Sequence, residues 1–355
     1  MANNRVFYAC QGVAIGPTGS NFGSDAHVRT VHGVQSIGIT TNFNLEQAFE
    51  LGQIQIYENI EGTPEVEVTL EKVLDGHPLI YHLCTPNATS HTLVNRSKER
   101  SCVALGFYPD DKDSISGVAT AEVVCSGMYL SNISYTLAGD GNSTESVTLV
   151  GNTKTWSTSP TFLSANQAAE IGIDFATGAG TDAPYAGSGV SRREDVDLAN
   201  SILPASIFGT VGTAAGNAFR AGDSTNPVVH IQNFTCSTDL SREDILELGR
   251  KTPYYRAPNF PVEVTSEFEV ISVSGDFVSA NELSASNTNE ETIKMRTKNG
   301  VVIDLGTKNR LSSVSYGGGD ATGGNATQTY SYTNFNDFAI KRLSAGLDPA
   351  GLSGT

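Results

Sequence analysis

The chain is poor in the residues that build disulfide frameworks and metal sites. Its 355 residues include five cysteines and six histidines, and no two cysteines stand in a CxxC spacing. An odd number of cysteines argues against complete pairing in disulfides. Without a CxxC pair or a matching histidine pair there is no zinc motif. We therefore expect reduced cysteines, no metal and no cofactor.

Basic residues and long apolar runs are also scarce. Lysine and arginine number 22 against 38 aspartates and glutamates, so the formal net charge is -16. A protein that holds nucleic acid through its phosphates would show the opposite sign. No stretch approaches the roughly 20 apolar residues of a membrane span, and no basic segment precedes a long apolar run. We expect no membrane association and no signal peptide.

Catalytic motifs are missing as well. The sequence contains no GxSxG, and its glycine-rich segments lack the lysine and hydroxyl residue of a phosphate loop. Asp111 and Asp113 have a DxD spacing, but no glycine and distal glutamate complete a calcium loop. We expect no enzyme, and assign no catalytic residue.

What the chain does contain is an internal repeat. Three pairs of segments carry it: 34–53 with 231–250 at an offset of 197, 66–69 with 262–265 after a one-residue slip, and, more weakly, 130–135 with 311–316. Two related units in one chain indicate a pseudo-symmetric building block rather than a single active site.

The first matching segments alternate apolar and polar residues. This period of two is typical of a strand with one buried face. The apolar rows are Ile37, Ile39 and Phe43 in one copy and Phe234, Cys236 and Leu240 in the other. We expect these rows to superpose in a shared fold.

A second shared motif follows each of these strands. Asn44 and Ser241 stand where a helix N-cap would, and Gly52 and Gly249 stand where a helix would end. The pattern predicts a helix of about two turns in each copy, anchored to the sheet by its leucine. The repeat and assembly motif consists of Glu50, Leu51 and Gly52 in the first copy and Glu247, Leu248 and Gly249 in the second.

The next strand carries acidic residues on one side in both copies. These rows are Glu65, Glu67 and Glu71 in the first copy and Glu263, Glu267 and Glu269 in the second. Like charges on one sheet face repel each other, so the face must lie in water. Both a solvated outer surface and the wall of a water-filled channel satisfy this. We expect at least one row to line a channel.

The repeat and the abundance of glycine, serine, threonine and asparagine predict a mainly β protein. We divide the chain into a first β domain, a linker or insertion, a second β domain and a flexible tail. Their boundaries are 1–150, 151–227, 228–343 and 344–355.

The repeated segments resemble tail tube proteins of long-tailed bacteriophages. The residues that carry the resemblance are 33–37, 50–53 and 64–71 in the first half and 192–196, 239–243, 247–250 and 260–265 in the second. The resemblance implies two tandem β-sandwich or barrel domains, each with a short helix, that self-assemble into stacked rings around a channel for DNA.

The implied partners are further copies of the chain, transiently passing double-stranded DNA, and tail sheath, tail terminator and baseplate proteins. The implied location is a virion tail assembled in the host cytoplasm. Most tube proteins carry one such domain and form six-fold rings, whereas this chain carries two. Three chains in a pseudo-six-fold ring and six chains with the second domain outside are both open, and we favour three.

A receptor- or carbohydrate-binding β-sandwich component of the tail is the alternative function. Such a module would use clustered exposed aromatic residues. Trp156 is the only tryptophan, and Tyr254 and Tyr255 form the only adjacent tyrosine pair.

Overall fold

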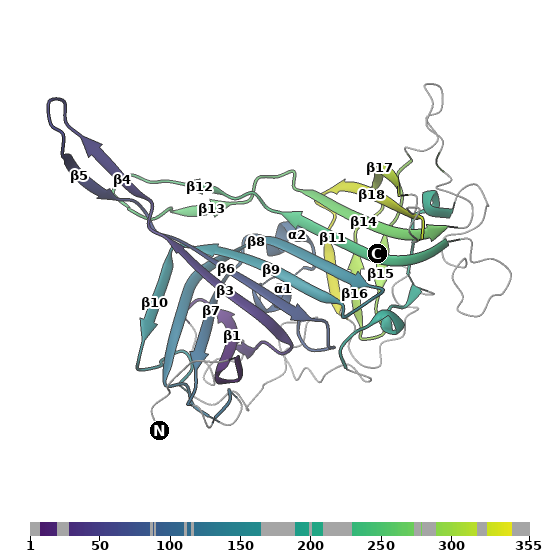
Figure 1. The fold of residues 1–355 in the computed structure, drawn as a ribbon, viewed down its shortest axis with the longest axis horizontal. Helices are drawn as coiled ribbons and strands as arrows, with labels where there is room; N and C mark the ends of the chain where they lie inside the picture. The colour runs from purple at the N-terminus through teal and green to yellow at the C-terminus, as the bar shows by residue number, and fades with distance from the viewer. Residues whose placement is uncertain are drawn as a thin grey trace.

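In the computed structural model the chain is mainly β, with large antiparallel sheets and short helices (Figure 1). The structure describes residues 8–19, 28–85, 88, 90–109, 112–114, 117–164, 189–198, 201–208, 229–272, 278, 289–317 and 325–342. The tail predicted at 344–355 and most of the insertion at 151–227 lie outside the described residues.

The described part of the first half contains ten strands and two short α-helices. The strands are β1 (Gln11–Pro17), β2 (Arg29–Thr30), β3 (Val34–Asn42), β4 (Leu45–Phe49), β5 (Ile56–Glu61), β6 (Glu65–Val73), β7 (Arg100–Phe107), β8 (Ala121–Ala138), β9 (Thr144–Gly151) and β10 (Thr153–Ser157). The helices are α1 (Ile80–Leu83) and α2 (Leu93–Arg96), and a 3-10 turn, η1, spans Tyr8–Cys10.

The described part of the second half contains nine strands and only 3-10 helical turns. The strands are β11 (Val229–Asp239), β12 (Glu243–Ile245), β13 (Tyr255–Ala257), β14 (Glu263–Ser272), β15 (Lys294–Arg296), β16 (Val301–Asp304), β17 (Arg310–Gly317), β18 (Thr327–Phe335) and β19 (Ala339–Arg342). The 3-10 turns η2 (Arg193–Asp195) and η4 (Ala205–Phe208) precede them.

Eight strands form one continuous antiparallel sheet, called here the main sheet. Their order is β3-β6-β9-β8-β11-β14-β18-β17. Strand β8 is long, and its first part leaves the main sheet to pair with β7 and β10, while β7 pairs with β1 and β1 with β2. The main sheet therefore runs through both halves of the chain (Figure 1).

Strand pairing repeats along the main sheet. The order β3-β6-β9-β8 recurs as β11-β14-β18-β17, and bulges fall at corresponding places in β3 and β11 and in β8 and β17. Ile37 pairs with Leu70 as Phe234 pairs with Phe268. The sequence repeat thus corresponds to a repeated pairing pattern. The division into two separate domains stays a prediction, because one sheet spans both.

The predicted match of segment 66–69 with 262–265, in β6 and β14, is wrong by two residues. Thr41 pairs with Val66, and its counterpart Thr238 pairs with Val264. Val66 therefore corresponds to Val264 and not to Val262. The connection between the two strands is one residue longer in the second copy, so the offset grows instead of shrinking.

The two predicted helices are absent, and each copy has a β-hairpin in their place. Strands β4 and β5 form the first hairpin, and β12 and β13 form the second. Leu51 and Leu248 are fully exposed at the tips, so they do not anchor anything to the sheet.

Local hydrogen bonds explain why the helix signals were misleading. The Asn42 side chain accepts the N–H of Asn44, and the Asp239 side chain accepts the N–H of Ser241, at 3.1 and 2.8 Å. These Asx turns lead into a hairpin instead of capping a helix. At the tip, Gly52 is the third residue of the β-turn and takes a φ of 92°, as a type II turn requires.

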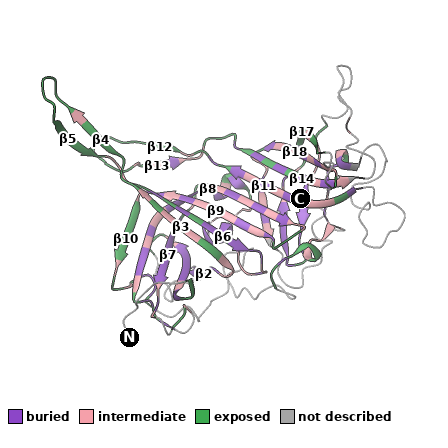
Figure 2. Ribbon diagram, viewed as in Figure 1, coloured by how far each residue is buried: buried purple, intermediate pink, exposed green. Residues whose placement is uncertain are grey.

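The apolar face of the main sheet forms the core. From Glu65 to Lys72 in β6 exposed and buried residues alternate, and Figure 2 shows the same alternation in the neighbouring strands. The buried row of the main sheet includes Val66, Val68, Leu70, Ile133, Tyr135, Val147, Leu149, Phe234, Cys236, Val264, Phe268, Tyr330 and Tyr332.

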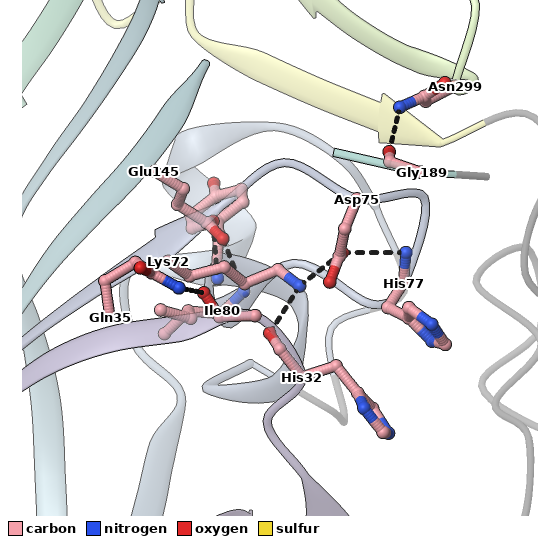
Figure 3. A network of polar contacts seen from close by, with 11 residues as sticks. His32, Gln35, Lys72, Asp75, His77, Ile80, Glu145, Gly189 and Asn299 are labelled. Atoms are coloured by element: carbon pink, nitrogen blue, oxygen red, sulfur yellow. Dashed lines mark hydrogen bonds and ion pairs between the residues drawn. The ribbon is translucent and has the colours of Figure 1, made fainter. Parts of the chain in front are cut away.

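A buried carboxylate ties helix α1 to this core (Figure 3). Glu145 accepts the backbone N–H groups of Ile80 and Tyr81 at 2.7 and 3.0 Å, and the Tyr135 hydroxyl at 2.7 Å. Burial raises the pKa of the Glu145 carboxyl, while these three donors and nearby Lys72 act in the opposite direction. Lys72 is itself buried and donates to Asp75 and to the His32 carbonyl, both at 2.7 Å.

We expect Glu145→Ala to lower the free energy of unfolding by about 3–5 kcal/mol, because three buried donors lose their acceptor. Urea denaturation of the unassembled chain measures this. Glu67→Ala, on the exposed face of the neighbouring strand, is the control and should change stability by less than about 0.5 kcal/mol. Equal effects of the two substitutions would contradict the role assigned to Glu145.

Candidate assembly surfaces

The two halves of the chain meet at a seam formed by β8 and β11. The pairing runs from Asn132 opposite Asp239 to Ala138 opposite Asn233, and Leu240 adds a backbone N–H to the Ser131 carbonyl at 2.8 Å. Tyr135 and Cys236 face each other across this seam and are fully buried. In sheet order, the seam joins β8, at the end of the first four-strand unit, to β11, at the start of the second.

The counterparts of the two seam strands lie at the free edges of the main sheet. β3 corresponds to β11, and β17 corresponds to β8. Among the described strands β3 pairs only with β6, and β17 pairs only with β18, at opposite ends of the sheet (Figure 1). Free strand edges carry unpaired N–H and C=O groups that can pair with another chain.

Apolar residues at these edges are less covered than their counterparts at the seam. Ile37 and Ile39 in β3 are half-buried, whereas Phe234 and Cys236 are buried. Tyr316 in β17 is 58% exposed, whereas its counterpart Tyr135 is fully buried. At both free edges of the main sheet, the apolar core is therefore partly exposed to solvent.

The opposite face of the main sheet is mainly polar, and its apolar residues include Val150 opposite Glu67 and Phe335 opposite Glu263. The structure places the carboxylate rows of β6 and β14 on this exposed face, as the alternation predicted. Residues paired with them in the other strands are mainly serine, threonine and asparagine. Whether this face lines a channel stays a prediction.

Four of the six row glutamates have partners. Glu71 accepts from Ser36, Glu267 from Ser331 and Glu269 from Asn233, and Glu65 lies 3.5 Å from Arg256. The carboxylates of Glu67 and Glu263 make no such contact within the described ranges. Arg310, at the free edge of β17, brings a positive charge to the same face.

Both hairpins expose apolar side chains at their surfaces. In the first hairpin these are Leu45, Phe49, Leu51, Ile54, Ile56, Tyr57 and Ile60, and in the second Ile245, Leu246, Leu248 and Tyr254. Glu50 and Gly52, like Glu247 and Gly249, form the tip turns, where Gln53 and Arg250 donate back to the two glutamate carbonyls. The assembly motif therefore marks hairpin tips, and exposed apolar tips are typical of interaction sites.

The second hairpin is bound at its base to the first copy. Arg242 donates to the carbonyls of Leu130, Ser97 and Arg256, and its guanidinium lies 4.9 Å from the centre of the Tyr129 ring. Burial lowers the pKa of Arg242 to about 10. Arg256 lies 3.1 Å from Asp244 and 3.5 Å from Glu65.

Sequence reasoning did not find the hairpins, the seam or Arg242. The apolar residues between Phe49 and Ile60 were an available signal, since a two-turn helix cannot bury a row that continues so far beyond Gly52. The seam joins strands about a hundred residues apart, and no local pattern indicates which strands will pair.

In the described part of the chain no group of three or more histidine, cysteine, aspartate or glutamate side chains is placed to hold a metal ion. All five cysteines are buried and outside disulfides. No helix among the described residues is long and apolar enough to cross a membrane.

No family model matches the chain, and no curated protein matches it. Among solved structures, the chain is similar to one described as the anti-feeding prophage cap, an AFP tube terminating cap. The identity is 12%, the TM-score is 0.32, and the match covers 44% of this chain and 93% of that one. A likeness this low carries no argument about function.

Proposed function

We propose that this chain is a structural protein of a virion tail. Three copies close into a ring, and stacked rings form a tube whose channel passes double-stranded DNA. The observation that carries the proposal is the internal seam, because β8 and β11 pair within the chain while their counterparts β17 and β3 are free. A chain with one internal seam and two such complementary edges is suited to head-to-tail assembly.

The internal seam supplies a register for pairing between chains. Transferring it to the free edges places Thr41 opposite Val314 of the next chain, Thr40 opposite Ser315, and Ile39 opposite Tyr316. This pairing covers Ile39 and Tyr316 and continues the apolar core from chain to chain. A closed ring then leaves no strand edge exposed.

The proposed number of chains combines the repeat with the six-fold rings of the tail tube proteins that the sequence resembles. Two copies of the pairing unit in each chain give six units in a ring of three, with alternating internal and intermolecular seams. Exposed apolar hairpin tips suit contacts between stacked rings. The polar, acidic face suits a channel for DNA, because it offers phosphates hydrogen-bonding hydroxyls but few cations.

We expect a Thr40→Cys, Ser315→Cys double variant to give disulfide-linked species that end at three chains. Residues directly opposite in an antiparallel pair have Cα atoms about 4.5–5.5 Å apart, within disulfide range. Mild oxidation followed by non-reducing electrophoresis measures the ladder, and the native cysteines do not interfere because all are buried.

Each single cysteine variant is the control and should give no ladder. A ladder that runs beyond three chains would contradict the three-chain ring, and its absence would contradict the seam. Electron microscopy of the same samples should show hollow rings or tubes, whereas isolated monomers would overturn the proposed function.

A further inference from the structure

We propose that Glu58 of one chain and Arg310 of the next form an ion pair that distinguishes the seam between chains from the seam within a chain. The inference rests on the proposed ring. It concerns an interaction surface whose partner is a second copy of this chain, and it starts from the way the second hairpin is held.

Within the chain, aromatic side chains of the second hairpin pack against the first copy. Tyr255 of β13 packs edge-on against Tyr129 of β8, with ring centres 5.9 Å apart at 84°. Thr63, before β6, donates to the Lys251 carbonyl near the hairpin tip. Figure 1 shows β12 and β13 lying above the ends of the first-copy strands, in the direction that the first hairpin also takes.

The counterparts of these two tyrosines follow from strand register. Ala48 pairs with Glu58 in the first hairpin as Ile245 pairs with Tyr255 in the second, so Glu58 corresponds to Tyr255. Tyr129 begins the β8–β9 pairing, and Arg310 begins the equivalent β17–β18 pairing. Arg310 therefore corresponds to Tyr129.

A seam between chains built like the internal seam places Glu58 against Arg310 of the next chain. An aromatic contact is thus replaced by two opposite charges at equivalent positions. Both groups are available in the isolated chain: Glu58 is exposed, and Arg310 is exposed with Glu290 at 3.5 Å on its own chain. The seam between chains therefore brings together the opposite charges of Glu58 and Arg310, whereas the seam within a chain brings together two tyrosines.

Other contacts that hold the second hairpin are also not conserved at the equivalent positions of the first hairpin. Arg242, which holds the second hairpin, corresponds to Leu45 in the first hairpin, so the arginine anchor is absent there. Arg256 contacts Glu65 within the chain, and their counterparts are Asn59 and Glu263. Glu263 borders a surface cavity of about 470 Å³ that is lined by Asn132 of β8 and by residues of the second copy.

The ion pair would give the assembly its specificity. Electrostatic complementarity selects partners and fixes register more than it adds affinity. Here it favours pairing of β17 with β3 of another chain over pairing with the internal strand β11. If β17 paired with β11 of another chain, the second hairpin would lie against Arg310. Tyr255 would then stand where Glu58 stands in the first hairpin, with Arg256 next to it, so Arg310 would find no carboxylate at that position.

Charge reversal tests the pair. We expect Arg310→Glu and Glu58→Arg each to raise the critical concentration for ring formation by about tenfold or more at low salt, because like charges then meet at the seam. The double reversal should return it to within about threefold of the wild type. Light scattering and electron microscopy measure assembly, and thermal melting of the unassembled chains checks folding.

Glu46→Arg, at another exposed glutamate of the same hairpin, is the matched control and should assemble like the wild type. Single reversals that assemble normally, or a double reversal as weak as the singles, would overturn the ion pair while the ring stands. A wild-type protein that forms no rings would overturn the proposed function itself, so the two failures are separable.

Discussion

The variant Tyr316→Asp is expected to fold normally and to form no rings. Tyr316 is 58% exposed in the isolated chain, so its replacement should change the free energy of unfolding by less than about 0.5 kcal/mol. In the proposed ring the same position lies on the core face, opposite Ile39 of the next chain. An aspartate buried there without a cation costs several kcal/mol at every seam between chains, and assembly fails.

The counterpart Tyr135→Asp tests the same position at the internal seam. Tyr135 is fully buried and donates to Glu145, so a second carboxylate there meets both desolvation and like-charge repulsion. We expect it to lose about 4 kcal/mol or more of stability. Sedimentation and urea denaturation measure both variants. Rings formed by the Tyr316 variant would show that this edge does not join chains.

Placing lysine at Glu67 and Glu263 is expected to leave folding nearly unchanged and to slow the passage of DNA. Both carboxylates lie on the exposed face of the main sheet, and neither has a partner among the described residues. Each substitution replaces a negative charge by a positive one. If this face lines the channel, the new ammonium groups bind phosphates, and binding should weaken steeply as salt is raised.

Fluorescence anisotropy of a labelled short duplex mixed with assembled tubes measures the binding, and genome release from virions measures the consequence. A matched control, Glu46→Lys with Glu194→Lys, makes the same change in charge at exposed positions away from the main sheet. DNA binding by the control as strong as by the channel variant, or normal release in the channel variant, would contradict the channel assignment.

The strands and the repeat were predictable from local pattern. Alternation of apolar and polar residues identified β3, β6, β11 and β14, because a strand places successive side chains on opposite faces whatever it pairs with. The same rule put the carboxylates of Glu67 and Glu263 on the exposed side. The match of 130–135 with 311–316 also agrees with the register of β8 and β17.

The hairpins show where local signals are ambiguous. An asparagine or serine before a polar segment, followed by a glycine, is equally suited to a capped helix and to an Asx turn with a β-turn at its tip. Asn44 and Ser241 adopt positive φ angles of 46° and 40°, which a helix N-cap does not. Cross-strand pairing decided the outcome, and that pairing lies outside any short window of sequence.

The partners of the buried polar groups were equally out of reach. Glu145 shares the buried face of β9 with Val147 and Leu149, so strand alternation indicates its side, but no local pattern indicates which donors satisfy its carboxylate. Its place at the start of α1, with Tyr135 beside it, arises only when β8, β9 and the helix pack together. Desolvation and its compensation are properties of the folded environment.

The amino-acid sequence thus specified the strands, their buried and exposed faces and the duplication, since all three depend on side chains a few residues apart or on direct comparison of segments. The tertiary structure decided which strands pair, which edges stay free and what the hairpins touch. The physical reason is that Ser134 meets Ser237 and Arg242 meets Tyr129 only after distant segments close on each other, and the pattern of one strand does not encode its partner.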